Sequence, residues 1–122
     1  MTRAGPIPIL RVANVLLTTI HVDLQDTIAA AFQEDVLLEI EASGAKGIVI
    51  DISGLEEVDT HVARILAETG SMARLMGARA VLVGMRPEVA ATLVRMGYAM
   101  GAIETSLDVE EGLRLLGAWP KG

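Results

Sequence analysis

The sequence predicts an α/β fold with a mainly parallel central sheet, an N-terminal β-hairpin at one edge of that sheet, and four helices. Three observations support this prediction. Continuous apolar segments at residues 47–52 and 80–83 are typical of strands that are covered on both faces. Segments with apolar residues at helical spacing follow each of them. Two further apolar segments, joined by Ala13-Asn14, come before all of these and indicate a hairpin.

The hairpin and the first helix open the chain. The two hairpin strands are expected at residues 7–12 and 15–20, and Asn14 tolerates the geometry of the turn between them. Asp23 is a candidate N-cap for the first helix, and Gly44 is suited to end it. Apolar residues recur along this helix at helical spacing: Leu24, Ile28, Phe32, Val36, Leu37 and Ile40.

The second helix is expected from residue 60 to 76, after the strand at 47–52, and Gly77 ends it. One face of this helix carries Val62, Ile65, Leu66, Thr69, Met72, Ala73 and Met76. We expect Met72, Met76 and, in the next helix, Met96 to fill the core and not to form a soft-ligand metal site.

The last elements continue the alternation of strand and helix. After the strand at 80–83, Pro87 is favourable at the first position of a third helix, which ends at Gly97 and carries Val89, Leu93 and Met96. A short strand is expected near residues 102–104. Asp108 and Glu111 form a capping-box pattern for a last helix that holds Leu113 and Leu116. The predicted order is β-β-α-β-α-β-α-β-α, with right-handed crossovers between parallel strands.

Composition limits the classes of function. The 122 residues suit one domain with a core of its own, which we expect to span residues 1–122, and 52% apolar content excludes a disordered chain. There is no apolar run of about 20 residues and no apolar signal core, so we expect a cytoplasmic protein without a membrane partner. The chain has no cysteine, which excludes disulfides and thiolate chemistry. A net charge of −6 and 2% aromatic residues argue against nucleic acid as a partner.

The most informative segment is residues 47–66, where a polar turn connects a buried strand to a helix opened by Asp59 and Thr60. Backbone N–H groups at a helix entrance attract anions, so a phosphate on Thr60 would be well placed. Glu56, Glu57 and Asp59 lie at the same position and would repel that phosphate, which makes the segment a candidate switch. Threonine is also an ordinary N-cap, and the residues alone favour this simpler role.

Asp51 ends a central strand, where α/β sheets usually place their sites. A phosphoacceptor of the response-regulator type would also need an acidic pair after the first strand and a lysine late in the sheet, and the chain has neither at those positions. We therefore expect Asp51 to bond the turn through Ser53 and Gly54.

Other chemistry finds little support. A metal site from His61, Asp59 and Glu56 lacks a defined ligand geometry, so we expect a solvent-facing His61 and no metal. No nucleophile elbow, Walker loop or dinucleotide-binding motif occurs, and no cofactor is expected. Thr92 lies inside the third helix, where a packed or surface role is the simpler interpretation.

One segment resembles the signature of STAS domains in anti-sigma factor antagonists: Asp51-Ile-Ser-Gly-Leu-Glu-Glu-Val-Asp59-Thr60. Four more are similar to the single-domain STAS scaffold proteins of the bacterial stressosome: Pro6-Ile-Pro-Ile-Leu10, Phe32-Gln-Glu-Asp35, Met76-Gly-Ala78 and Ile103-Glu-Thr105. The similarity covers nearly the whole chain. It implies the STAS fold, which agrees with the order of elements above.

The resemblance also implies a function, that of a non-enzymatic scaffold and phosphoswitch in a general stress or related pathway. An RsbT-like serine/threonine kinase would bind, phosphorylate Thr60 and be released. The other implied partners are an RsbR-like sensory STAS protein, a PP2C-type phosphatase and further copies of the chain. The surroundings of the phosphosite would bind these partners: Asp51, Ser53, Glu56, Glu57, Asp59 and His61.

Three alternatives stay open. Threonine at position 60 is commoner in RsbR-type paralogues than in the scaffold proteins, and residues 86–92 resemble the paralogue segment with a second phosphosite, which makes Thr92 a second candidate. A free anti-anti-sigma factor would bind one anti-sigma kinase, although His61-Val62 replaces the Ser-Gly of such proteins. An enzyme or small-ligand binder would need a polar pocket, which the sequence does not indicate.

Overall fold

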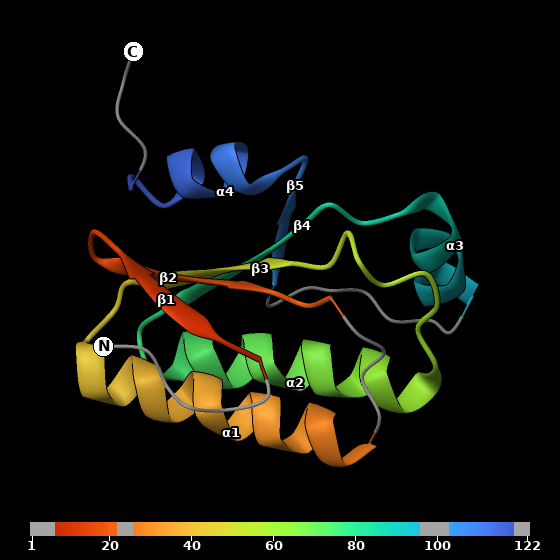
Figure 1. The fold of residues 1–122 in the computed structure, drawn as a ribbon, viewed down its shortest axis with the longest axis horizontal. Coiled ribbons are helices and arrows are strands. Elements are labelled where there is room, and N and C mark those ends of the chain that lie inside the picture. The colour runs from red at the N-terminus through yellow and green to blue at the C-terminus, as the bar shows by residue number, and fades with distance from the viewer. Residues whose placement is uncertain (1–6, 22–25, 96–102, 119–122) are drawn as a thin grey trace.

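The computed structural model describes residues 7–21, 26–95 and 103–118. Within these residues the chain forms a five-stranded sheet in the order β1-β2-β3-β4-β5 with helices on both faces (Figure 1). The elements are β1 (Ile9–Val12), β2 (Val15–Thr19), α1 (Asp26–Ser43), β3 (Gly47–Asp51), α2 (Thr60–Leu75), β4 (Arg79–Val83), α3 (Pro87–Arg95), β5 (Glu104–Ser106) and α4 (Val109–Leu115). The predicted fold class and order of elements are confirmed.

The sheet is parallel except for its hairpin edge. β1 pairs antiparallel with β2, and the strands from β2 to β5 run parallel, so their carboxyl ends meet at one edge. Val12 pairs with Val15, which leaves a two-residue loop. Ala13, and not Asn14, has the positive φ in this loop, at 53°. Asn14 is held by its carbonyl, which accepts a hydrogen bond from Lys46 N at 2.9 Å.

The sheet separates two apolar layers of different size. α1 and α2 cover one face, and α4 covers part of the other (Figure 1). Successive side chains of a strand point to opposite faces, so Ile48 and Ile50 enter the larger layer with α1 and α2, whereas Val49 enters the smaller layer beside Leu113. α3 lies near the end of the sheet where the parallel strands terminate, and it contributes Val89 to the larger layer.

Two polar contacts inside the larger layer fix α1 against its neighbours. Glu39 is 4% exposed, and its Oε1 accepts a hydrogen bond from Arg11 Nε on β1 at 3.1 Å. Gln33 Nε2 donates to Oγ1 of the buried Thr69 on α2, at 3.2 Å. A carboxylate or hydroxyl can be buried at low cost only with such partners, so both contacts specify how α1 packs.

The expectation that Met72 and Met76 fill the core is wrong, because they are 40% and 43% exposed. The buried stripe of α2 is shifted toward small residues. Gly70 and Ala73 are buried, and a Cβ on Gly70 would lie 2.9 Å from Ile103. Helical spacing therefore identified the element correctly, but the buried face also includes Gly70, beside Ile103, and excludes Met72 and Met76.

The short fifth strand begins later than expected, at Glu104 and not at residue 102. Ile103 is 5% exposed and packs against Gly70, so the parallel pairing with β4 starts only at Glu104, opposite Val81. Six residues named in the sequence analysis lie outside the described part of the chain: Pro6, Asp23, Leu24, Met96, Gly97 and Ala102. Within the described part, no helix is long and apolar enough to cross a bilayer.

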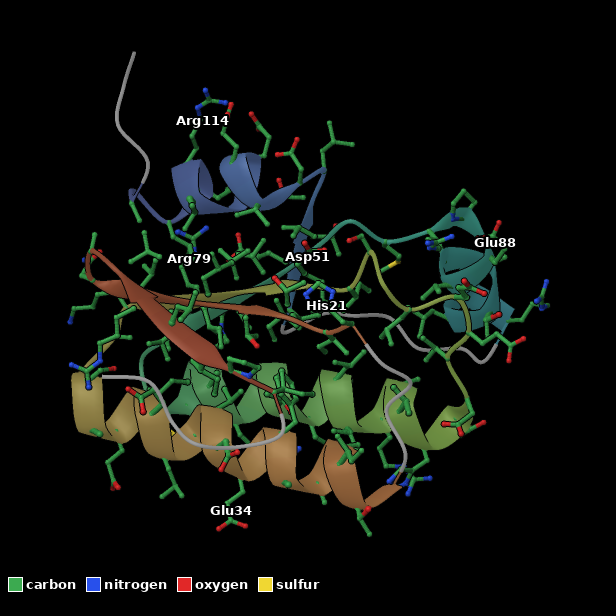
Figure 2. The ribbon with its side chains drawn as sticks, in the orientation of Figure 1. His21, Glu34, Asp51, Arg79, Glu88 and Arg114 are labelled. Atoms are coloured by element: carbon green, nitrogen blue, oxygen red, sulfur yellow. The ribbon has the colours of Figure 1, made fainter. Side chains whose placement is uncertain are left out.

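An ion pair ties the sheet edge to α4. Arg79 on β4 donates from Nε and Nη2 to the two carboxylate oxygens of Glu104 on β5, at 2.7 and 2.6 Å, and from Nη1 to the carbonyl of Leu115 at 3.2 Å. Figure 2 shows Arg79 next to α4. The hydrogen bonds from Arg79 hold the pKa of the Glu104 carboxyl below its ordinary value, with smaller Coulombic contributions from Arg79 and Arg74.

We expect Glu104→Gln to lower the free energy of unfolding by less than about 1 kcal/mol at pH 7, because both partners are more than one third exposed. A lowered carboxyl pKa stabilises the fold above the ordinary pKa, and the contribution disappears as the pH falls through the lowered value. Urea unfolding between pH 7 and pH 2 should show the wild type and the variant converging. Glu68→Gln is the control, since Glu68 is exposed and unpaired within the described residues. A difference that persists in acid would contradict this role.

Candidate functional site

The connection between β3 and α2, residues 52–59, lies at the edge where the parallel strands end. Every third residue from its start is buried: Ile52, Leu55 and Val58 are 0%, 1% and 5% exposed. Three exposed polar residues lie between them, Ser53, Glu56 and Glu57, and the exposed Asp59 follows Val58. The loop is therefore anchored by apolar side chains and presents carboxylates to solvent.

Asp59, and not Thr60, is the N-cap of α2. Its backbone is extended, and its Oδ1 accepts a hydrogen bond from Val62 N at 2.8 Å. Thr60 is the first helical residue and is exposed. The interpretation of Thr60 as an ordinary N-cap is therefore wrong, because the preceding carboxylate occupies the capping position. The helix does not depend on the Thr60 hydroxyl for its cap.

Asp51 bonds the turn as expected, since its Oδ1 accepts a hydrogen bond from Ser53 N at 2.9 Å. Figure 2 shows Asp51, the last residue of β3. Two glycines allow neighbouring groups to approach closely, a backbone carbonyl at Gly54 and side-chain atoms at Gly84. A Cβ on Gly54 would lie 2.5 Å from the carbonyl oxygen of Ile20, and one on Gly84 would lie 2.9 Å from Asp51 Oδ1. Gly84 also has a φ of +73°, which favours glycine.

Arg86 belongs to the site and was missed from the sequence. It follows β4 and precedes α3, and its Nε donates a hydrogen bond to the carbonyl of Ser53 at 2.9 Å. One signal could have indicated it: the carboxyl ends of β3 and β4 meet at one edge, so residues just after residue 83 face residues just after residue 51.

His61 differs from the expectation of a solvent-facing side chain. It is half-buried, and its Nε2 atom is shielded from solvent. It lies one helical turn before the buried Ile65, so both residues lie on the same face of α2. Within residues 7–21, 26–95 and 103–118, no group of three histidine or acidic side chains could hold a metal ion, so His61, Asp59 and Glu56 do not form such a group.

Thr92 lies on α3, outside the β3–α2 loop. It is half-buried, and its Oγ1 donates to the carbonyl of Glu88 at 2.9 Å. Thr92 Oγ1 also accepts a hydrogen bond from Arg95 Nη2 at 3.5 Å. Its hydroxyl is thus engaged with its own helix. A separate pocket of about 210 Å³ lies on the hairpin, and neither Thr60 nor Thr92 lines it. Its lining residues are Pro8, Leu10, Leu17, Thr18, Thr19 and His21.

The site consists of an exposed threonine at a helix start, a well-anchored acidic loop and one arginine from the adjacent strand end. Chains with this fold are known. Residues 7–112 match the STAS domain, and the chain belongs to the STAS domain family.

Two groups of relatives are the most informative. The chain is 31% identical to the RsbT co-antagonist protein RsbRA of Bacillus subtilis (strain 168) over 86 residues, which is 70% of this chain and 31% of that protein. It therefore spans about a third of the length of this relative. Among solved structures it is similar to RsbS of Moorella thermoacetica, with 38% identity and a TM-score of 0.83 over 93% of this chain and 96% of that one. A chain in a structure of the stressosome, described as a signal integration and transduction hub, is also 38% identical, with a TM-score of 0.75 over 90% and 96% of the two chains.

The close packing at Gly84 predicts a specific stability effect. Gly44 and Gly84 both have a positive φ, of 68° and 73°. A Cβ at Gly44 would meet nothing within 4 Å, whereas a Cβ at Gly84 would meet Asp51 Oδ1 and the Ser53 Cβ at 2.9 Å. Gly44→Ala should therefore lower the free energy of unfolding by the backbone cost alone, about 1–2 kcal/mol. Gly84→Ala should cost more, as measured by urea denaturation. Equal losses would contradict the tight contact at Gly84.

Proposed function

We propose that this chain is a non-enzymatic STAS scaffold and phosphoswitch of the stressosome type. It binds an RsbT-like serine/threonine kinase, accepts a phosphate on Thr60 and then releases the kinase. The observation that carries the proposal is the arrangement of Asp59 and Thr60: Asp59 caps α2, and the next residue, an exposed threonine, begins the helix. The similarity to RsbS over nearly the whole chain supports it.

The proposed reaction is carried out by the kinase, with this chain as the substrate. A bond forms between Oγ1 of Thr60 and the γ-phosphorus of ATP, the bond from that phosphorus to ADP breaks, and the hydroxyl proton passes to a base of the kinase. Thr60 is suited to this role because it is exposed and because its helix keeps its cap.

Phosphorylation would change the surface far more than the fold. A phosphate adds about −1.5 to −2 charges at neutral pH. The start of α2 would stabilise this charge by about 0.3–1 kcal/mol. Glu56, Glu57 and Asp59 already make the adjacent surface acidic, so a kinase docked there would meet a dense negative patch after the transfer. We infer that this repulsion is what releases the kinase.

The proposed partners follow from the relatives. The RsbR proteins are RsbT co-antagonists, and the stressosome contains a chain that is 38% identical to this one. We infer co-assembly with an RsbR-like sensory protein and with further copies of the chain, and reversal of the switch by a PP2C-type phosphatase. Exposed apolar side chains offer contact surface for assembly, among them Leu10 on β1 and Leu75 on α2, which are 48% and 89% exposed.

The second candidate function is that of an RsbR-type STAS paralogue. The observation that favours it is the threonine at position 60 together with 31% identity to RsbRA. The two roles differ in what they require for assembly. A scaffold should form large particles only when a sensory STAS protein is added, whereas an RsbR-type chain should form them when an RsbS-type scaffold is added.

Thr60→Ala should abolish most phosphate incorporation by the RsbT-like kinase, as mapped by mass spectrometry after incubation with ATP. The free energy of unfolding should change by no more than about 0.5 kcal/mol, because Thr60 is exposed and Asp59 supplies the cap. Thr105→Ala is the matched control, since Thr105 is an exposed threonine on β5.

Two outcomes would contradict the assignment of Thr60. Full incorporation in the Thr60→Ala variant, with the label on Thr92, would move the phosphosite to α3. Loss of folding in that variant would show that Thr60 has a structural role that outweighs any role as a switch.

Assembly provides an independent expectation. Light scattering of the chain with an RsbR-like partner should show particles in the megadalton range, since the stressosome is a large assembly of STAS proteins. Leu10→Lys on the exposed hairpin edge should weaken self-association, while Leu107→Lys, at a residue that is 79% exposed beyond β5, should not. Only small heterocomplexes with a kinase would instead favour a free anti-anti-sigma factor.

A further inference from the structure

The backbone of Ser53, the second residue of the β3–α2 loop, is held through both its N–H and its carbonyl. Ser53 N donates to Asp51 Oδ1, and the Ser53 carbonyl accepts from Arg86 Nε, each at 2.9 Å. One of these side chains comes from the end of β3 and the other from the residues that follow β4. The lack of a side chain at Gly84 leaves room for the Asp51 carboxylate and for Ser53.

Polar contacts matter at this point because burial does not hold the loop here. Ser53 is exposed and Gly54 is half-buried, whereas the later anchors Leu55 and Val58 are buried. The far end of the loop is fixed separately by the Asp59 cap. Ile52, just before Ser53, is buried, its N donates to the Val83 carbonyl at 3.0 Å, and its carbonyl accepts from Leu55 N at 2.9 Å. The side-chain hydrogen bonds to Ser53 therefore act on the exposed turn between Ile52 and Leu55.

The contact made by Arg86 uses a single donor and does not neutralise a charge. Its Nε binds the Ser53 carbonyl, and no ion pair joins Arg86 to a carboxylate among the residues that the structure describes. The hydrogen bond, and not the charge, is what connects β4 to the loop.

We propose that Arg86 is a positioning residue for the kinase-binding loop, acting through its Nε donor to fix the Ser53 carbonyl. The inference rests on the proposed function, in which the kinase recognises the loop that carries Glu56 and Glu57. A loop released at Ser53 samples more conformations, and a kinase that binds it must order it again. Thr60 itself stays fixed by the Asp59 cap. Loss of the contact should therefore raise the KM for this chain as a kinase substrate and leave kcat unchanged.

Two substitutions of Arg86 separate the donor from the charge. Glutamine has its amide nitrogen the same number of bonds from Cα as arginine Nε, so Arg86→Gln retains a donor at that position and loses the charge. Lysine has a methylene at that position and its ammonium one bond further from Cα, so Arg86→Lys retains the charge and removes the donor from the position of Nε. Arg74→Lys is the control, because Arg74 is an exposed arginine in the last turn of α2, at the opposite end of the helix from Thr60.

The kinetic experiment measures phosphorylation of Thr60 by the RsbT-like kinase at varied concentrations of the full chain. Arg86→Lys should raise KM about 3- to 10-fold, which corresponds to the loss of one hydrogen bond, with kcat unchanged. Arg86→Gln and Arg74→Lys should stay within about twofold of the wild type. A normal KM for Arg86→Lys would overturn the proposal, and a raised KM for Arg86→Gln alone would assign the role to the charge instead.

Hydrogen exchange on the isolated chain tests the contact between Arg86 and the Ser53 carbonyl without the kinase. Amides of residues 54–58 should exchange faster in Arg86→Lys than in Arg86→Gln, while amides within α2 exchange equally in both. Equal exchange at residues 54–58 would overturn the proposal. If the wild-type chain accepts no phosphate on Thr60, the proposed function fails, and the exchange comparison still decides whether Arg86 holds the loop.

Discussion

The structure depends on the burial of β3 between two apolar layers. Ile48 and Ile50 are fully buried on the side of α1 and α2, and Val49 is fully buried on the side of α4. Full burial of such side chains contributes about 1.5–3 kcal/mol each. Because β3 pairs on both sides, it also sets the register of β2 and β4. The positions of Asp51 and of the loop that follows are consequences of where this strand ends.

The site divides stability and recognition between different side chains of the same short loop. Stability comes from buried apolar residues and from the Asp59 cap, and in the proposed function recognition is left to the exposed Glu56, Glu57 and Thr60. A charge added on the outside is remote from the core, so the core has no reason to respond to it. Such an arrangement suits a surface that must change sign or density of charge while its backbone stays in place.

Periodicity in the sequence was sufficient to predict the helices and strands, but it was insufficient to predict the contacts between them. The strands at residues 47–52 and 80–83 were predictable because a run of apolar residues needs cover on both faces. The exposure of Met72 and the contact of Ile103 with Gly70 were not, since helical spacing does not say which of two neighbouring stripes of α2 meets residues far away in the chain. The contact of Arg86 with Ser53 was not predictable either, because it too joins residues that are far apart in the chain. The cap was assigned to the wrong neighbour because two adjacent residues, Asp59 and Thr60, are both good caps and only backbone geometry separates them.

The burial of every third residue in the β3–α2 loop fixes its length as well as its composition. Ile52, Leu55 and Val58 each occupy a place in the core, and Asp59 follows at the only position from which it can cap α2. Insertion of a single residue would rotate this pattern and carry Glu56 or Glu57 inward in place of an apolar side chain. The number of residues between Asp51 and Thr60 is therefore constrained by packing. The exposed residues of this loop can vary in type more freely than the loop can vary in length.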